Sequence, residues 1–259
     1  MKYLDLTLPT PAENLACDEA LLDGCEDGHC PEELLRVWEP QRPFVVVGYA
    51  NKVATEVNLP ACEARDIPVL RRCSGGGTVL QGPGCLNFAL VLKITGTGPL
   101  HSIASANRFI MDRNRTALES VLQRRCRSGE AQNFNCEIRH PKSEVTVRGH
   151  TDLAVGSLKF SGNSQRRRRN FLLFHGSFLL QADLALISEL LPMPSKQPDY
   201  RGNRSHQDFL TNLPATADEV KAALLRAWNA EEPFNHPPLE AAAALAREKY
   251  ATPEWNHMR

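Results

Sequence analysis

The stretch Arg71-Arg-Cys-Ser-Gly-Gly-Gly-Thr-Val79 places three consecutive glycines in a part of the chain that otherwise has the composition of strands. Residues 68–72 and 86–92, on either side, are rich in apolar and β-branched residues and predict two strands. Consecutive glycines add backbone entropy cost and supply no side chain to a core, so packing does not explain them. They predict a loop whose main chain lies against a ligand.

The pattern of this loop excludes two common nucleotide-binding motifs. It is not the phosphate loop G-x-x-x-x-G-K-S/T, and it is not a G-x-G-x-x-G turn that opens a helix. The exposed amides of such a loop can line an anionic or amide-bearing ligand, and Arg71 or Arg72 can hold a phosphate or carboxylate through its planar fork.

Hydrophobic periodicity outside the loop predicts the remaining elements. Helices are expected at 12–23, 103–125, 218–228 and 239–250, with a short one that Asp183 caps and that ends at Leu191. Further strands are expected at 35–38, 43–48, 145–147, 152–155, 158–160, 171–175 and 177–180. Strands, one long helix and then strands joined by tight turns predict an α+β fold with a mixed, largely antiparallel sheet flanked by helices.

Four local expectations follow from the same patterns. In the first helix, Asp18 and Glu19 point about 100° apart and are expected to face water. The segments 35–38 and 43–48 are expected to form a hairpin or adjacent strands. Residues 127–144 are polar and predict a flexible insertion, and residues 192–208 predict a loop rich in proline, arginine and serine.

Composition excludes several classes of protein. The 259 residues carry 30 basic and 30 acidic side chains, and a net charge of zero argues against a chain that mainly neutralises nucleic-acid phosphates. No apolar run approaches the ~18 residues that span a bilayer, and the first residues do not form a secretory signal, so a cytoplasmic protein is expected. The eight cysteines are scattered without a C-x-x-C pair, which predicts reduced thiols and no structural zinc.

A second informative cluster runs from Asp152 to Gln165. Lys159 follows the predicted Gly156-Ser157 turn and precedes Gly162 by three residues. Its ammonium either points into a site as a fixed positive charge or lies along the surface with its head in water.

The two clusters together resemble the lipoate–protein ligase A family, within the wider biotin/lipoate ligase group. The resemblance rests on R-R-x-S-G-G-G-x-V, G-P-G-C-L-N-F, D-L-x-V-x-x-x-K-F-S-G-N-S-Q and H-G-S-F-L-L, and it extends over nearly the whole chain. It implies a biotin/lipoate protein ligase-like catalytic domain at residues 1–235 and a C-terminal helical tail at 236–259. It also implies that ATP with Mg²⁺ activates lipoate or octanoate to an acyl-adenylate. The acyl group then passes to a lysine of a lipoyl carrier, either a glycine-cleavage H protein or the lipoyl domain of an acyltransferase subunit.

The resemblance assigns Lys159 as the catalytic residue, in contact with the α-phosphate and the acyl carbonyl. The apolar strand segments 90–92 and 172–174 are expected to wall an acyl tunnel, and no metal-binding residue is expected. His175 either takes an acid/base role or is a hydrogen-bonded structural residue. The expected residues of the ATP and lipoyl-adenylate site are Arg72, Ser74, Gly75, Gly76, Gly77, Thr78, Val79, Leu80, Asn87, Asp152, Lys159, Gly162 and Asn163.

The chain departs from the family pattern in two respects. Many members continue into an accessory domain that helps to form the adenylate, whereas this chain ends at Arg259. Either a separate subunit supplies that part, or the enzyme forms the adenylate alone, or it only transfers preformed acyl groups. Related transferases use a cysteine shortly before the lysine motif, but the equivalent position falls near Glu144, and Cys136 lies eight residues earlier.

Two rival functions therefore stay open. One is an ATP-independent lipoyl or octanoyl transferase, and the other is a non-catalytic subunit that binds carriers. Lys159 and the triple glycine argue against the second.

The run Arg166–Arg169 is either a solvated strand edge or an electrostatic dock for an acidic carrier. It lacks interleaved aromatic residues and the chain is not basic overall, so no nucleic acid is expected as a partner. The short apolar runs predict no membrane partner.

Overall fold

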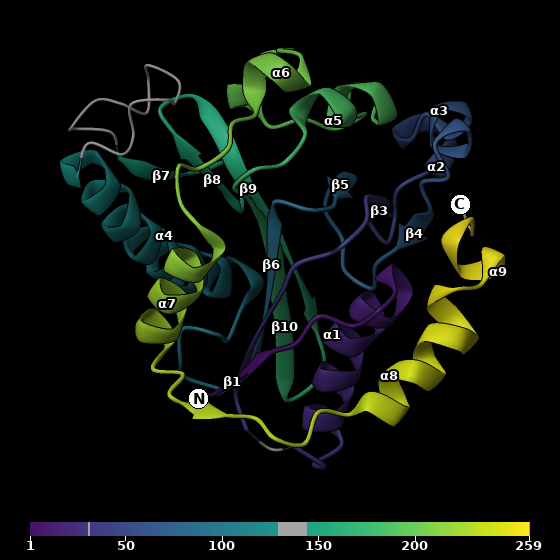
Figure 1. Ribbon diagram of the computed structural model, residues 1–259. Coiled ribbons are helices and arrows are strands. Elements are labelled where there is room, and N and C mark those ends of the chain that lie inside the picture. Colours follow the sequence, from purple (N-terminus) through teal and green to yellow (C-terminus); the bar gives the residue numbers. More distant parts are fainter. Residues whose placement is uncertain (31, 129–143, 259) are drawn as a thin grey trace.

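The strands of the computed structural model, which describes residues 1–30, 32–128 and 144–258, form two sheets (Figure 1). The larger sheet has the order β11-β1-β2-β6-β10-β9-β8-β7, and the smaller one has the order β4-β3-β5. Parallel pairs occur where β1 meets β2 and β11 and where β3 meets β4, and the other neighbours are antiparallel. The expected α+β fold with a mixed, largely antiparallel sheet is confirmed. The strands are β1 Lys2–Asp5, β2 Leu34–Trp38, β3 Phe44–Val47, β4 Val69–Arg71, β5 Val79–Gln81, β6 Cys85–Lys93, β7 Val145–Arg148, β8 Asp152–Val155, β9 Leu158–Arg167, β10 Phe171–Leu179 and β11 Glu232–Pro233.

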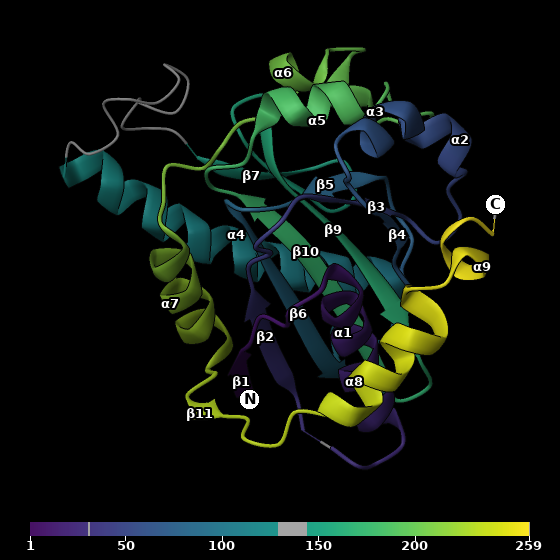
Figure 2. The same ribbon diagram turned by 45° about the vertical axis from the view of Figure 1, so that its right-hand side comes forward.

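Helices cover both faces of the larger sheet. Helices α4 and α7 lie on one face, and α1 and α8 lie on the other (Figures 1 and 2). Within the described ranges, none of the helices combines the length and the apolar composition needed to cross a bilayer. The helices are α1 Pro11–Glu26, α2 Val53–Glu56, α3 Leu59–Ala64, α4 Ile103–Ser128, α5 Leu184–Leu190, α6 His206–Phe209, α7 Ala217–Trp228, α8 Leu239–Leu245 and α9 Pro253–Asn256, with the 3₁₀ turn η2 Asp199–Arg201 and the π turn η3 Ala246–Tyr250.

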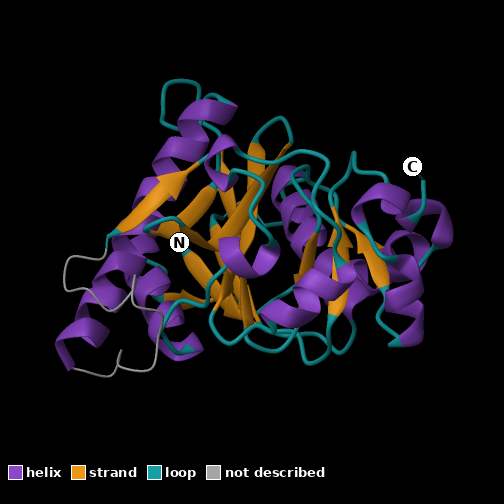
Figure 3. Cartoon of the chain, turned by 90° about the horizontal axis from the view of Figure 1, so that it is seen from above, coloured by secondary structure: helices purple, strands orange, loops and turns teal. Residues whose placement is uncertain are grey.

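The central strand β6 explains why the run 88–92 is apolar throughout. Leu86, Phe88 and Leu90 pack against α4 and α7, whereas Ala89 and Val91 pack against α1. Since successive side chains point to opposite faces, a strand covered on both sides needs apolar residues at every position. The smaller sheet forms a separate group of strands beside the larger one, as the view from above shows (Figure 3).

The prediction that Asp18 and Glu19 face water is wrong. Their residues are 2% and 3% exposed, because α1 lies between the larger sheet and α8. Asp18 pairs with buried Arg36 at 2.6 Å, and Glu19 pairs with Lys249 at 2.6 Å. Paired partners are what burial of a carboxylate requires.

The segments 35–38 and 43–48 were expected to form a hairpin or adjacent strands, and this is also wrong. Strand β2 pairs with β1 and β6 in the larger sheet, whereas β3 pairs with β4 and β5 in the smaller one. The turn between them, which contains Pro40 and Pro43, carries the chain from one sheet to the other.

Several other expectations on local structure can be compared with the fold. Asp183 caps α5 by accepting from the N–H of Leu186, and the Gly156-Ser157 turn joins β8 to β9, as expected. The segments 171–175 and 177–180 form the single strand β10, and the expected loop 192–208 contains η2 and the start of α6. Of the expected insertion 127–144, residues 129–143 lie outside the described residues.

Buried Arg71 joins three segments at the end of β4. It donates to the main-chain oxygens of Trp255 and Asn256 in α9, at 3.1 and 3.0 Å, and to those of Gly48, Tyr49 and Asn51 after β3, at 2.8–3.1 Å. These contacts fix the backbone immediately before the glycine-rich loop. They also turn the guanidinium away from any ligand. Arg71 is therefore not the residue that holds a phosphate or carboxylate, which was one of the two expected alternatives.

Candidate functional site

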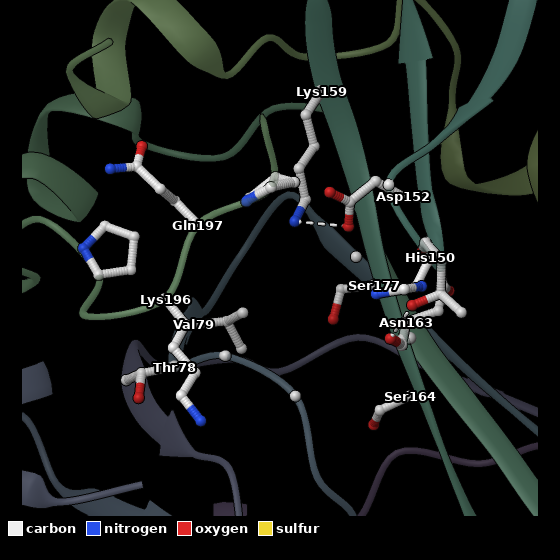
Figure 4. A pocket seen from close by; sticks show the side chains of 18 of the residues that line it. Thr78, Val79, His150, Asp152, Lys159, Asn163, Ser164, Ser177, Lys196 and Gln197 are labelled. Atoms are coloured by element: carbon white, nitrogen blue, oxygen red, sulfur yellow. Dashed lines mark hydrogen bonds and ion pairs between the residues drawn. The ribbon is translucent and has the colours of Figure 1, made fainter. Parts of the chain in front are cut away.

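A pocket of about 970 Å³ lies between the glycine-rich loop, the strands β8 to β10 and the segment that follows α5. This volume is at the upper end of the usual range for small-molecule sites. Figure 4 shows Lys159 and Asp152 on neighbouring strands, with Thr78 and Val79 of the loop and Lys196 and Gln197 of the following segment opposite them. Of the residues expected from the sequence, the pocket is lined by Arg72, Gly76, Gly77, Thr78, Val79, Asn87, Asp152, Lys159, Gly162, Asn163 and His175.

Three expected residues are not part of the lining. Leu80 packs into the apolar core beside the smaller sheet, and Ser74 lies buried beneath the loop. Gly75 is exposed but does not face the cavity. The segments 90–92 and 172–174, expected to wall a tunnel, belong to the core on the two faces of the larger sheet and do not line this pocket.

The guanidinium of Arg72 holds the shape of the glycine-rich loop. Its Nη2 donates to the carbonyls of Gly75 at 2.5 Å and Gly77 at 2.7 Å, and its Nε donates to the Ser74 Oγ at 3.2 Å. Burial lowers the pKa of Arg72 to about 10, so the side chain stays charged at neutral pH. A charged fork beneath the loop orients the loop carbonyls inward, which leaves the opposite side of the main chain for a ligand.

Close backbone contact explains two of the glycines around the loop. Gly76 has a φ of +87°, and a Cβ on Gly48 would lie 2.1 Å from the Gly76 carbonyl oxygen. The loop therefore lies directly on the chain that follows β3, and only glycine at position 48 permits this approach.

Lys159 is held at the pocket by Asp152. The Lys159 Nζ lies 2.8 Å from Asp152 Oδ1, and the Tyr200 hydroxyl donates to Asp152 Oδ2 at 2.9 Å. Burial, and after it the charge of Asp152, raises the pKa of Tyr200, so its phenol remains a donor. A Cβ on Gly162 would lie 3.0 Å from the Lys159 Nζ, so glycine there leaves room for the ammonium to lie over the strand.

Asn163 and Asn87 form a polar wall beside this lysine. Asn163 donates to the Thr151 carbonyl at 2.8 Å, and its Oδ1 has no hydrogen-bond partner among the described residues. The missing side chain of Gly176 leaves space for that amide, since a Cβ there would overlap with it. Asn87 accepts a hydrogen bond from Ser177 at 2.5 Å. An unpaired, buried acceptor at a pocket wall is suited to a ligand donor.

Side chains of both charges line the pocket. Arg148, Lys159 and Lys196 line it together with the exposed Asp199, whereas its buried carboxylates are paired within the protein. Asp18 pairs with Arg36, and Glu56 accepts hydrogen bonds from Ser195. Among the described residues, no group of three or more His, Cys, Asp or Glu side chains is placed to hold a metal ion. The arrangement is suited to an anionic ligand.

A buried hydrogen-bonded chain leads from the pocket into the protein. Ser164 Oγ lies 2.7 Å from Ser74 Oγ, which lies 2.5 Å from His175 Nε2. His175 Nδ1 lies 3.3 Å from Asp18 Oδ2, and the other oxygen of Asp18 accepts from Arg36. Sequence analysis identified His175 and Ser74 but missed Asp18, because an acidic residue near the start of an amphipathic helix has the pattern of a solvated position.

No described cysteine lines the pocket. Cys73 lies next to Ser74, but burial raises the pKa of its thiol to about 12, and burial raises the pKa of Cys85 to about 12 as well. Thiols of this kind are poor nucleophiles at neutral pH. Cys136, the other candidate, lies outside the described residues.

Tyr200, Lys196 and His150 also line the site and were not identified from the sequence. Tyr200 and Lys196 come from the segment 192–208, whose composition indicates only a loop. A tyrosine and a lysine between prolines carry no spacing signal, and their role depends on how that segment folds back over β8 and β9.

The chain is similar in sequence to several known proteins. A sequence model of the lipoyl protein ligase A/B catalytic domain matches residues 10–229. The chain is 28% identical to an octanoyltransferase LipM of Geobacillus kaustophilus, over 100% of this chain and 98% of the relative. It is 26% identical to lipoate-protein ligase A subunit 1 of Thermoplasma acidophilum, over 97% of this chain and 95% of the relative.

A solved structure agrees in fold. The bi-partite lipoate protein ligase of Thermoplasma acidophilum, described together with its E2 lipoyl domain, has a TM-score of 0.78 at 22% sequence identity, over 99% of this chain and 95% of that chain. The match extends over both sheets and over the helices on either face of the larger one.

Proposed function

Because the chain belongs to the family of lipoyl protein ligase A/B catalytic domains, we propose that it is an ATP-dependent lipoate–protein ligase. It converts lipoate, or octanoate, to an acyl-adenylate and transfers the acyl group to a lysine of a lipoyl carrier. One observation carries this proposal. Asp152 holds the Lys159 ammonium at a pocket that no described cysteine lines.

In the first step, a lipoate carboxylate oxygen attacks the α-phosphorus of ATP, and pyrophosphate leaves. Negative charge collects on the α-phosphate oxygens, where the Lys159 ammonium and the main chain of Gly76 and Gly77 would stabilise it. In the second step, the carrier amine attacks the acyl carbonyl and AMP leaves with the electron pair of the broken C–O bond. The same fixed positive charge stabilises the oxyanion without reorganisation.

Mg²⁺ fits this site as a companion of the nucleotide. It usually binds through one or two carboxylates, several waters and the phosphates of the substrate, so it does not need a cage of protein ligands. Asp152 is the carboxylate beside Lys159 that would share such an ion. The ion would neutralise phosphate charge.

The direct test uses the purified protein with ATP, Mg²⁺, lipoate and an apo lipoyl domain. We expect the carrier to gain the mass of one lipoyl group, with one AMP released for each carrier modified. Transfer from synthetic lipoyl-adenylate without any transfer from ATP and lipoate would contradict a complete ligase and assign activation to a partner.

Octanoyl transfer without ATP is the second candidate, because the similarity to an octanoyltransferase covers the whole chain. An octanoyl thioester on a carrier protein is an activated acyl donor with which this reaction can be tested. Incubation of the protein with this donor and an apo lipoyl domain, without ATP, distinguishes the two candidates. Octanoylation of the domain under these conditions supports the transferase.

Substitution of Cys136 tests the same alternative from the side of the protein. We expect Cys136→Ala to leave ATP-dependent lipoylation unchanged, because the proposed chemistry needs no thiol nucleophile. The measurement is the rate of carrier lipoylation, with Cys126→Ala as a matched cysteine control. A loss of 10²-fold or more confined to Cys136→Ala would contradict the ligase and support a thioester intermediate.

Gly48→Ala tests the role of the glycine-rich loop. A Cβ at this position would displace the backbone of Gly76, so we expect carrier lipoylation to slow by about 10²-fold. The control is Gly96→Ala, where a Cβ meets nothing within 4 Å. Equal rates for the two variants would show that the loop does not position the substrate.

We propose a lipoyl carrier as the protein partner, with a separate accessory subunit as an additional one. The Thermoplasma relatives support both, since one is named subunit 1 and the other is a bi-partite ligase described with its E2 lipoyl domain. The run Arg166–Arg169 contributes less to a carrier dock than its composition implies. Arg167 donates to the Leu100 carbonyl at 2.8 Å and Arg168 pairs with Asp23 at 2.7 Å, so both are already engaged.

A further inference from the structure

The buried chain Ser164–Ser74–His175–Asp18 has one consistent direction of hydrogen bonding. The Asp18 carboxylate only accepts, so the His175 Nδ1 carries the proton and donates to it. In the neutral imidazole, His175 Nε2 is then the acceptor of the Ser74 hydroxyl, and the Ser74 oxygen accepts from Ser164. The chain is set to move a proton inward, from the pocket toward the imidazole.

The inner part of this chain has the order of a serine, histidine and aspartate triad, but Ser74 does not have the exposure of a nucleophile. Ser74 is 1% exposed and does not line the pocket. Its oxygen already accepts from Arg72 Nε at 3.2 Å. Ser164, by contrast, is half-buried and lines the pocket, with its side chain visible at the wall in Figure 4.

We infer that Ser164, Ser74 and His175 form a proton relay that accepts a proton from the carrier lysine before it attacks the acyl-adenylate. This inference rests on the proposed function. A lysine side chain is an ammonium at neutral pH and has no lone pair for attack. The relay takes one proton from it: Ser164 accepts from the ammonium and passes its own proton to Ser74, and Ser74 passes its proton to His175.

Acyl transfer to the lysine follows the loss of this proton. The neutral amine forms the C–N bond, the C–O bond to phosphate breaks, and AMP takes that electron pair. The second proton of the nitrogen leaves with AMP or to water, and His175 returns its proton to water after release.

Asp18 is the charged group that contacts the imidazole directly, and two buried guanidiniums lie beyond it. From α1, Asp18 contacts it directly, and from β2, Arg36 holds the other oxygen of Asp18. From the glycine-rich loop, Arg72 contacts Ser74, and from β9 the relay ends at Ser164. Arg36 fixes the orientation of the carboxylate, and the carboxylate then stabilises the imidazolium, as in other paired His and Asp groups.

The test separates proton removal from positioning by a change of acyl acceptor. Synthetic lipoyl-adenylate is given to the wild type and to Ser74→Ala, with either an apo lipoyl domain or hydroxylamine as acceptor. The nitrogen of hydroxylamine is already neutral at pH 7 and needs no base. We expect Ser74→Ala to slow transfer to the carrier lysine by about 10²–10⁴-fold, while transfer to hydroxylamine changes by less than threefold.

Two further variants complete the test. Ser164→Ala interrupts the same relay at the pocket wall and is expected to show the same dependence on the acceptor, even where Ser74→Ala does not fold. Ser188→Ala, which removes a serine hydroxyl on α5 that donates only to the Leu184 carbonyl, is the matched control and is expected to match the wild type.

Each contrary result has a separate meaning. Equal slowing for both acceptors, or unchanged transfer to the lysine in both Ser74→Ala and Ser164→Ala, overturns the relay and leaves the proposed function intact. An acyl group found on Ser74 by mass spectrometry overturns it in favour of a serine nucleophile. A wild type that transfers from lipoyl-adenylate to neither acceptor overturns the proposed function, and the relay with it.

Discussion

Lys159→Ala is expected to slow both half-reactions by about 10²–10³-fold while the fold is retained. The ammonium is the charge that Asp152 holds at the pocket, 2.8 Å from the Asp152 Oδ1. Of the other basic side chains on the lining, Arg148 and Lys196 are exposed, Arg72 is engaged with the glycine-rich loop, and buried Arg201 donates to the Arg204 carbonyl. Because charge develops on phosphate and acyl oxygens in both steps, loss of this ammonium removes stabilisation from each transition state.

The two half-reactions can be measured separately. Adenylate formation is followed by pyrophosphate release without a carrier, and transfer is followed by carrier mass with synthetic lipoyl-adenylate. The matched control is Lys221→Ala, which removes a lysine on α7 that pairs with Asp5 at 2.9 Å. Full activity of Lys159→Ala in either assay would remove this lysine from that step, and an unchanged thermal midpoint shows that any loss is chemical.

Arg71→Ala is expected to give the largest loss of stability of any single substitution proposed here, about 4 kcal/mol in the free energy of unfolding. The side chain is fully buried and donates to five main-chain carbonyls. A truncation leaves these carbonyls buried without a donor, and each such group is costly. Arg71→Lys is expected to recover only part of the loss, because an ammonium has three donors and no fork.

The measurement is the urea midpoint of unfolding, compared with that of Arg65→Ala. Arg65 forms a bidentate pair with Glu189 at 2.6 and 2.8 Å, no longer than the contacts of Arg71, but both side chains are exposed. Exposed pairs contribute little to stability, so the control is expected to unfold like the wild type. A midpoint for Arg71→Ala close to that of the control would show that α9 and the loop base do not depend on this residue.

Local patterns in the sequence predicted which helices and strands form better than they predicted how these elements pair. The helix at 103–125, the strand at 86–92 and the turn at Gly156-Ser157 have strong periodicity or turn chemistry, and all three are present. Whether the strands at 35–38 and 43–48 share a sheet depends on long-range pairing, which a local pattern does not contain. The buried carboxylates on α1 were missed for the same reason, since their partners Arg36 and Lys249 lie far along the chain.

The candidate site shows the same division. Gly76 was predicted because consecutive glycines contribute nothing to packing, whereas Gly162 was predicted only through the family resemblance. Asp18, which contacts His175, and Tyr200, which donates to Asp152, were not identified. These contacts exist only after distant segments come together.

The bonds from Arg71 to α9 also constrain the order of events during synthesis. Arg71 and its partners Trp255 and Asn256 are separated by 184 and 185 positions along the chain. At 5–20 residues per second, a ribosome needs roughly 10–40 s to cover that distance. Until Asn256 has left the exit tunnel, the base of the glycine-rich loop lacks its clamp, and the nascent chain carries an unfinished pocket. The base of this loop is therefore completed only after every described strand of both sheets has been synthesised.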